Sequence, residues 1–420
     1  MKIKVKVRTR LPLEEVLLFT ALFCVATFAL LEHTSITIPL FSYAKKPMLY
    51  LGGLCLLSQV KLYVHTFLKR KYFFVHLCVL LMCLFLMFSG ISNHHPTIGK
   101  SAVDSSIRTV LYLLELYALM VWAAEKGRGQ YVLNFLFVYV LIMTIATDFL
   151  LFSKLITFNR GKYEYYLVGT KFTVSYFHLN LVILSLMRSK KRRHSQLKEK
   201  LFTFAAILFT AFVSNYVDCM TGIIGSLFLM AMFVVEKTPL RNKMINFQSP
   251  GLVAACLAVS VLFPFVVEGF VSIPAVRYII EEVLGREAHL TGRVMIFQAY
   301  VPGMSGHWLW GYGYGNGNTV SEVLFRCANA QNALLHWILQ TGLITVTMMV
   351  VLILVIFRQM ERFGTVKRCM PMVLLVYVYI VMGTIETTFS MSFLLWIAVI
   401  FMLGAEKDPA AIPEERGVVR

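Results

Sequence analysis

Residues 72–91 read YFFVHLCVLLMCLFLMFSGI, a run of 20 residues that contains no Asp, Glu, Lys or Arg. A helix needs roughly 20 predominantly apolar residues to cross the hydrocarbon core of a bilayer. The length and composition of this stretch therefore predict one membrane-spanning α-helix.

Similar runs continue along the whole chain. Hydrophobic residues make up 58% of the 420 residues and charged residues only 15%, whereas soluble domains typically carry about 25% charged residues. We therefore expect an all-α integral membrane protein with about 12 transmembrane helices, forming a single polytopic membrane domain over residues 1–420. The expected spans are 12–31, 47–66, 72–91, 106–124, 131–153, 171–187, 201–217, 221–235, 250–272, 329–357, 371–385 and 388–404.

The distribution of positive charge predicts the orientation. With the N-terminus inside, the inner segments hold 27 of the 40 Lys and Arg residues, as the positive-inside rule requires. We expect both termini in the cytoplasm. The cluster at 188–193 (RSKKRR) is expected to face anionic lipid headgroups, so the net charge of +18 does not indicate a nucleic-acid partner.

One long segment, 273–328, is expected on the outer face between the ninth and tenth spans, with helix around 276–300. Long loops in compact proteins often carry function. Residues 308–317 read WLWGYGYGNG, in which Trp310, Tyr312 and Tyr314 alternate with glycines. Such rings suit an interfacial aromatic anchor and a sugar-binding platform equally well, and composition does not decide between them.

Several motifs in and after this loop resemble a known family. Thr291-Gly292-Arg293 is followed by GYG at 311–313, AQNALL at 330–335 and QTGL at 340–343. Together with the patterns at 167–175 and 221–225, their order and spacing resemble the O-antigen ligase and polysaccharide polymerase superfamily. The version here is most similar to the repeat-unit polymerases of capsular and exopolysaccharide clusters.

The resemblance implies a GT-C-like glycosyltransferase at the outer face of the bacterial plasma membrane. It would transfer a glycan from undecaprenyl diphosphate to a lipid-linked repeat unit, inverting the anomeric carbon without metal or other cofactor. The implied partners are the lipid-linked oligosaccharide, membrane lipid, and a chain-length regulator and flippase of the same pathway. An O-antigen-type ligase is the alternative enzyme, and a polysaccharide or lipid transporter is the alternative from another class.

Basic residues are the candidates for binding the diphosphate leaving group. A leaving diphosphate gains negative charge, so catalysis requires cations aimed at it. Arg293 is the first candidate, because arginine stays ionised and donates bidentately. Lys171, at the outer end of the sixth span, and Arg160 are further candidates for substrate binding.

Polar residues near the outer helix ends are the candidates for handling the acceptor. Gln331-Asn332 stands where ligases of the superfamily carry His-Asn, which weakens the ligase interpretation and leaves the general base unassigned. Asp218 and Glu386 are expected at the outer face, where each could hold an acceptor hydroxyl or pair with Arg293 or Lys171.

Three further ionisable residues lie within expected spans. His336, four residues after Asn332, could contact substrate or serve packing. Glu115 and Asp148 are expected in buried structural pairs, because an unpaired charge is costly inside a bilayer. His94 and His95 have no partner at zinc-ligand spacing, so we expect no metal site there.

Overall fold

Helices occupy every apolar run that the sequence singles out. The computed structural model describes residues 13–32, 34–93, 101–154, 158–160, 163–189, 196–237, 246–278, 281–282 and 293–406. Its helices are α1 Leu13–Leu30, α2 Thr34–Thr37, α3 Pro39–Leu57, α4 Val60–Phe67, α5 Arg70–Ser92, α6 Ala102–Glu125, α7 Gly129–Ser153, α8 Lys171–Ser189, α9 Gln196–Tyr216, α10 Met220–Lys237, α12 Pro250–Val271, α13 Pro274–Tyr278, α14 Arg293–Gly303, α15 Gly317–Phe325, α16 Ala333–Arg362, α17 Val366–Gly383 and α18 Met391–Ala405. Strands β1 Phe158–Arg160 and β2 Tyr163–Tyr165 form one antiparallel hairpin, with Phe158 opposite Tyr165.

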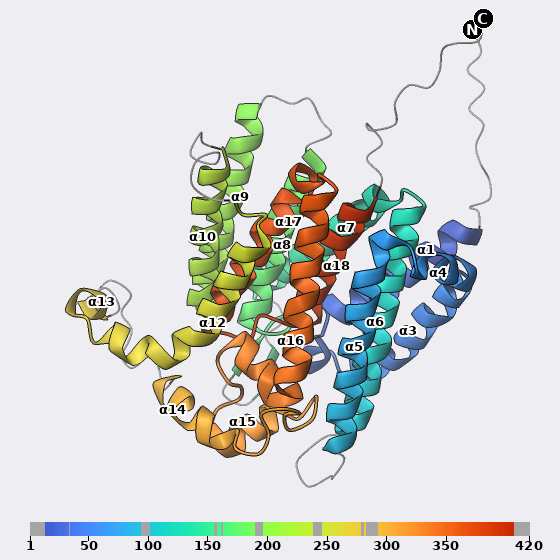
Figure 1. Ribbon diagram of the computed structural model, residues 1–420. Coiled ribbons are helices and arrows are strands. Elements are labelled where there is room, and N and C mark those ends of the chain that lie inside the picture. Colours follow the sequence, from blue (N-terminus) through green and yellow to red (C-terminus); the bar gives the residue numbers. More distant parts are fainter. Residues whose placement is uncertain are drawn as a thin grey trace, which may run out of the picture.

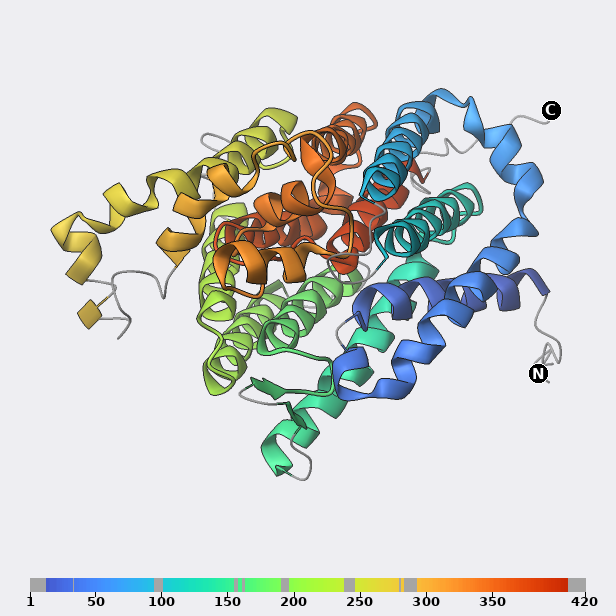
Figure 2. The ribbon, with the colours of Figure 1, turned by 90° about the horizontal axis from the view of Figure 1, so that it is seen from below.

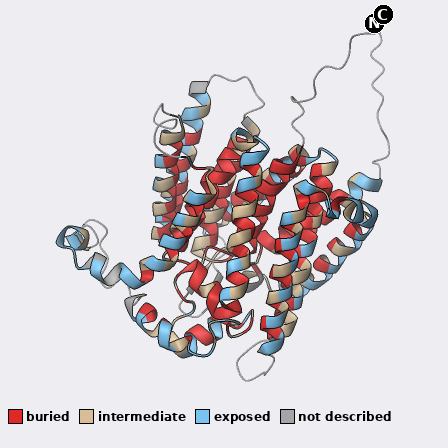
Figure 3. Ribbon diagram, viewed as in Figure 1, coloured by how far each residue is buried: buried red, intermediate tan, exposed pale blue. Residues whose placement is uncertain are grey.

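The bundle has two distinct ends (Figure 1). We call the end that carries α14, α15 and residues 304–332 the loop end, and the opposite end, where α1 begins and α18 ends, the terminal end. Viewed from the loop end, α17 and α18 lie at the centre and the other long helices surround them (Figure 2). Every residue of α18 is buried, as the red ribbon in Figure 3 indicates.

Six helices in the described part of the chain are long and apolar enough to cross a membrane: α1, α5, α6, α7, α16 and α17. The bent pair of α3 and α4 would make a seventh span, and shorter apolar helices lie in α10, α12 and α18. These helices define a membrane-embedded, all-α protein.

The second expected span, 47–66, is not one straight helix. It forms most of α3 and α4, which are bent by 71° at a break after Leu57. Lys61 and His65 lie in α4, and both side chains are exposed. A straight helix would place these polar groups inside the hydrocarbon core. The bend instead turns α4 sideways at the terminal end, where a lysine can reach water.

Of the two acids expected in structural pairs, only Asp148 is paired. Its Oδ1 lies 3.0 Å from Nε2 of His178, across the α7–α8 contact. The expectation is wrong for Glu115, which forms no ion pair with the described residues and whose buried Oε2 has no hydrogen-bond partner. Gly52 and Gly53 of α3 make room for this carboxyl but supply no donor, because a Cβ on either would lie 3.0 or 2.9 Å from its oxygens.

The glycine-aromatic segment enters the bundle and joins a break in α16. At Gly342 the α16 backbone leaves the helical region, with φ 78° and ψ 171°. The backbone groups of α16 that lose their helical partners at this break form hydrogen bonds with the loop. Tyr312 N–H donates to Leu339 O and Leu343 N–H donates to Trp308 O, both at 2.8 Å. Non-helical backbone is tolerated at membrane depth only where protein satisfies it. This segment is therefore part of the helical core rather than a surface connection.

Neighbouring contacts hold the same junction in place. The Ser89 hydroxyl of α5 donates to Trp310 O at 2.5 Å, and Gly315 N–H donates to Oε1 of Gln340 at 2.9 Å. The loop backbone passes so close to α16 that a Cβ on Gly311 would lie 2.5 Å from the carbonyl carbon of Gln340. These contacts hold the loop backbone against α5 and α16.

Candidate functional site

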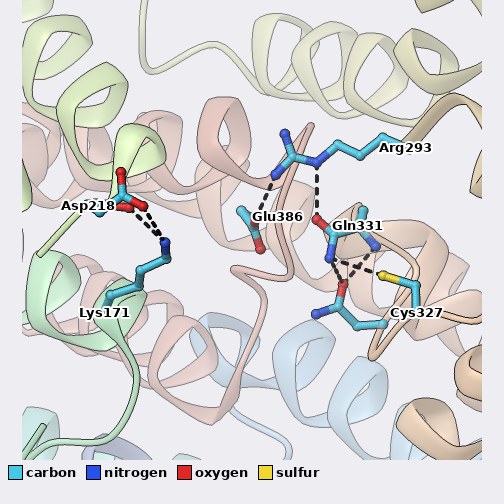
Figure 4. Close-up of polar contacts among 7 residues, drawn as sticks. Lys171, Asp218, Arg293, Cys327, Gln331 and Glu386 are labelled. Atoms are coloured by element: carbon cyan, nitrogen blue, oxygen red, sulfur yellow. Dashed lines mark hydrogen bonds and ion pairs between the residues drawn. The ribbon is translucent and has the colours of Figure 1, made fainter. Parts of the chain in front are cut away.

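A buried arginine–glutamate pair lies at the loop end. Nη2 of Arg293, the first residue of α14, donates to Oε1 of Glu386 at 2.8 Å. Glu386 belongs to the connection between α17 and α18, and its side chain is only 4% exposed against 18% for Arg293. Nε of Arg293 also donates to Oε1 of Gln331 at 3.1 Å (Figure 4). The structure thus brings together three candidates that lie far apart in the sequence.

Gln331 holds its position through a strained backbone and an asparagine. It has φ 50°, in the left-handed region that disfavours residues other than glycine. Oδ1 of Asn329 accepts from both the backbone N–H of Gln331 at 2.8 Å and its Nε2 at 2.9 Å. The amide oxygen of Gln331 is thereby turned towards Arg293. Sequence reasoning missed Asn329, although an Asn two residues before a conformationally unusual residue is a typical turn-forming signal.

Asn332 ties the surrounding helices together. It is fully buried and caps α16, with Oδ1 accepting from Leu335 N–H at 3.0 Å. Its Nδ2 donates to Ser260 O of α12 at 2.8 Å and to Thr384 O after α17 at 3.1 Å. Both amide hydrogens are therefore used within the protein, and Asn332 acts here as a positioning residue.

Helix α14 is fixed against α16 by one tyrosine. Tyr300 is fully buried, and its hydroxyl donates to Leu335 O at 2.7 Å. Its ring stacks on Phe325 of α15 with the centroids 5.8 Å apart. These contacts set the direction in which α14 presents Arg293.

A second cation–carboxylate pair faces the first. Nζ of Lys171, the first residue of α8, lies 3.2 Å from Oδ2 of Asp218 and donates to its backbone carbonyl at 2.8 Å. Asp218 joins α9 to α10 with φ 51°, again in the left-handed region. In Figure 4 this pair lies on one side and Arg293 with Gln331 on the other, with Glu386 between them. The Asp218 side chain is 72% exposed. The second pair is therefore accessible from outside the protein, whereas the Arg293–Glu386 pair is largely buried.

Burial and the neighbouring positive charges shift the pKa of the Glu386 carboxyl in opposite directions. Burial raises the pKa of the Glu386 carboxyl above its usual value, while the charges of Arg293 and Lys171 favour its ionised form. Arg293 stays ionised at any physiological pH. Protonation of Glu386 would therefore be the event that breaks the pair.

The three aromatic candidates are partly buried and pack against other rings of the protein. Trp310 lies 4.2 Å from Phe88 of α5, Tyr312 stacks on His307 at 3.8 Å, and Tyr314 lies 5.5 Å from Trp337 of α16, all between ring centroids. Among the described residues, their ring contacts are with the loop, α5 and α16. The structure therefore does not bring them to the Arg293–Glu386 pair, and the glycine-aromatic alternation serves the docking of the loop.

The remaining candidates fall elsewhere. His336 lies one turn below Asn332, facing α15, because a Cβ on Gly317 would lie 2.8 Å from its Cε1. Arg160 ends β1, and its side chain lies outside the described residues, as do Thr291, Gly292, His94 and His95. No group of three or more His, Cys, Asp or Glu residues in the described part of the chain could hold a metal ion.

The arrangement places two cation–carboxylate pairs at one end of a membrane-embedded helical bundle, with the Glu386 carboxylate between the two cations. No family model matches this chain, and no curated protein matches it.

Proposed function

We propose that this protein is a polysaccharide polymerase of the bacterial plasma membrane. It would transfer a glycan from undecaprenyl diphosphate to a lipid-linked repeat unit. The observation that carries the proposal is the Arg293 guanidinium, which Glu386 and Gln331 hold at the loop end. A preorganised cation stabilises a leaving diphosphate without having to reorganise during the reaction.

The orientation follows from the charge distribution. We propose that all twelve apolar helical segments cross the membrane in a GT-C-like arrangement, with the terminal end in the cytoplasm and the loop end outside. The excess of Lys and Arg in the segments assigned to the inner side supports this orientation. Lipid-linked substrate would then reach Arg293 from the outer leaflet.

The orientation can be tested at one cysteine. Cys327 is partly exposed at the loop end, and its Sγ lies 3.8 Å from Nε2 of Gln331, whereas Cys369, near the start of α17, is buried. We expect a membrane-impermeant maleimide, added to intact cells, to label the wild-type protein and not Cys327→Ser. Labelling only after the membrane is opened would place the loop end inside and contradict the proposal.

The two pairs suit an inverting displacement. The acceptor hydroxyl oxygen forms a bond to the anomeric carbon while the bond to the diphosphate oxygen breaks, and the diphosphate leaves with the electron pair. Inversion places nucleophile and leaving group on opposite faces of that carbon. We assign Arg293 to the leaving diphosphate and Asp218, on the opposite side in Figure 4, to the proton of the acceptor hydroxyl. Lys171 would hold Asp218, and it would bind the diphosphate of the lipid that carries the acceptor.

The role of Asp218 predicts a large kinetic effect. Because a general base typically contributes 10²–10⁴-fold, Asp218→Asn should lower the elongation rate by roughly 100-fold or more. Asp104→Asn is the matched control, since Asp104 is another acid at the loop end, with a side chain 49% exposed and paired with Arg108 at 2.9 Å. Equal rates for the two variants in purified form would remove Asp218 from the mechanism.

The buried carboxyl of Glu386 should make the elongation activity depend on pH. Its ionised form holds Arg293, and its pKa is raised, so activity should fall on acidification at a higher pH than an ordinary glutamate would cause. Glu386→Gln keeps a hydrogen-bond acceptor that does not titrate in this range. The acidic limb of its pH–rate profile should therefore move to lower pH, and an unchanged limb would show that another group sets it.

The polymerase proposal can be tested by measuring glycan elongation with purified protein. Purified protein in nanodiscs, incubated with lipid-linked repeat unit, should give a ladder of products that differ by one repeat. Transfer of a finished glycan to a different acceptor without a ladder would indicate a ligase. Movement of the lipid across a bilayer without any elongation would indicate a transporter.

A further inference from the structure

Exposed aromatic rings form a continuous surface beside the second pair. Phe209, Phe212 and Tyr216 lie on one face of α9, at a spacing of three and four residues, and Phe152 of α7 joins them. We call these four residues the aromatic track. Their ring centroids are 6.2 Å apart for Phe209 and Phe212, 6.5 Å for Phe212 and Tyr216, 6.4 Å for Phe152 and Phe212, and 5.2 Å for Phe152 and Tyr216.

The rings are open to the surroundings of the bundle. Their exposed fractions are 46% for Phe209, 55% for Phe212, 45% for Tyr216 and 41% for Phe152. Helix α8 contacts both α7 and α9, so the track bridges the two outer helices of this three-helix face. It therefore presents its rings to the apolar phase of the membrane.

The track ends at a cation. Tyr216 is the last residue of α9, and Asp218, two residues later, accepts from Nζ of Lys171 through its backbone carbonyl. Lys171 remains 38% exposed. From Phe209 to Tyr216, the end of α9, a helical rise of 1.5 Å per residue gives about 10 Å, close to a third of the roughly 30 Å hydrocarbon core. The rings thus extend from the loop end towards the membrane centre.

We propose that the aromatic track holds the isoprenoid tail of the acceptor lipid, whose own diphosphate binds beside Lys171. This inference rests on the proposed function and names where its lipid substrate lies. An isoprenoid tail carries a planar alkene in every unit, and flat rings pack well against planar groups. A saturated acyl chain has no such group, so the track would select isoprenoid from bulk lipid. The positive charge of Lys171 at the head of the track complements the diphosphate.

Binding can be measured without any glycan transfer. The probe is undecaprenyl diphosphate, compared with a saturated alkyl diphosphate of similar carbon number, each titrated into the full-length protein in nanodiscs. Wild type should prefer the isoprenoid. The variant Phe152→Leu/Phe212→Leu keeps the apolar character and removes two rings, so it should bind undecaprenyl diphosphate about tenfold more weakly and lose the preference.

A phenylalanine on the same helix is the matched control. Phe149 of α7 is 62% exposed and makes no ring contact with the track among the described residues. Phe149→Leu should therefore leave both affinities unchanged. An unchanged isoprenoid affinity in the double variant would overturn the proposal, as would an equal loss in Phe149→Leu. A change of oligomeric state with unchanged affinity would identify the track as an interface between copies and would overturn it too.

The outcomes separate this inference from the proposed function. If wild type prefers the isoprenoid and the double variant does not, but no ladder forms with lipid-linked repeat unit, the track stands and the polymerase proposal fails. If the ladder forms and the double variant binds normally, the polymerase proposal stands and the track fails.

Discussion

Replacing Arg293 with Ala should abolish the product ladder, with an expected loss of at least about 100-fold in elongation rate. Among the described residues of the site, the guanidinium is the one cation that donates to two side chains at once, Glu386 and Gln331, and so has a fixed direction. Arg293→Lys keeps the charge but not the planar fork, and should retain only a small part of the activity. Ladder length and initial rate with purified protein are the measurements.

Stability must be separated from chemistry in this experiment. Removing Arg293 leaves Glu386 buried without its partner, which typically costs 3–5 kcal/mol. The double variant Arg293→Met/Glu386→Leu removes both charges and should recover much of the thermal stability while remaining inactive. Arg277→Ala is the matched control, because Arg277 is 60% exposed and pairs with Glu281 at 3.0 Å in the same long segment. Long polymer from Arg293→Ala would contradict the assignment.

Replacing Gly342 with Ala should strongly destabilise the folded protein. A Cβ there would lie 2.0 Å from Leu309 O and 2.4 Å from Trp310 N, both backbone atoms that cannot move without undocking the loop. The conformation, φ 78° and ψ 171°, is also one that essentially only glycine adopts. We expect a loss of roughly 3 kcal/mol or more, seen as a lower thermal midpoint and faster proteolysis in detergent.

Gly306 is the matched control for this substitution. It has φ 79°, almost the same as Gly342, but a Cβ there would meet nothing within 4 Å. Gly306→Ala should therefore cost only about 1–2 kcal/mol, the intrinsic penalty of the left-handed region. Equal midpoints for the two variants would mean that the junction between the loop and α16 does not contribute to the fold.

The sequence was sufficient to predict the positions of the long apolar helices. Apolar runs such as 72–91 carry their own signal, because the length of a span and the absence of charge are local properties. The break between α3 and α4 was less visible, although Lys61 and His65 within the apolar run were a sign of it. Glu115 was misread because its surroundings, Gly52 and Gly53, come from another helix.

The site was predictable only in part. The sequence singled out Arg293, Glu386, Gln331, Lys171 and Asp218, and it allowed either acid to pair with either cation. The pairing itself, Arg293 with Glu386 and Lys171 with Asp218, was decided by how the loop end folds. The contacts of the Trp310, Tyr312 and Tyr314 rings were also not predictable, since composition did not indicate that they would pack against α5, α16 and His307.

The sequence by itself determined that this chain is a helical membrane protein with a polar, glycine-rich segment before its last helices. Hydropathy and charge act over short stretches, so no knowledge of the fold was needed. Only the tertiary structure decided that this segment completes a broken helix at Gly342, and that Arg293 meets Glu386. Those contacts join residues that are far apart in the chain, and their geometry depends on how all the helices pack together.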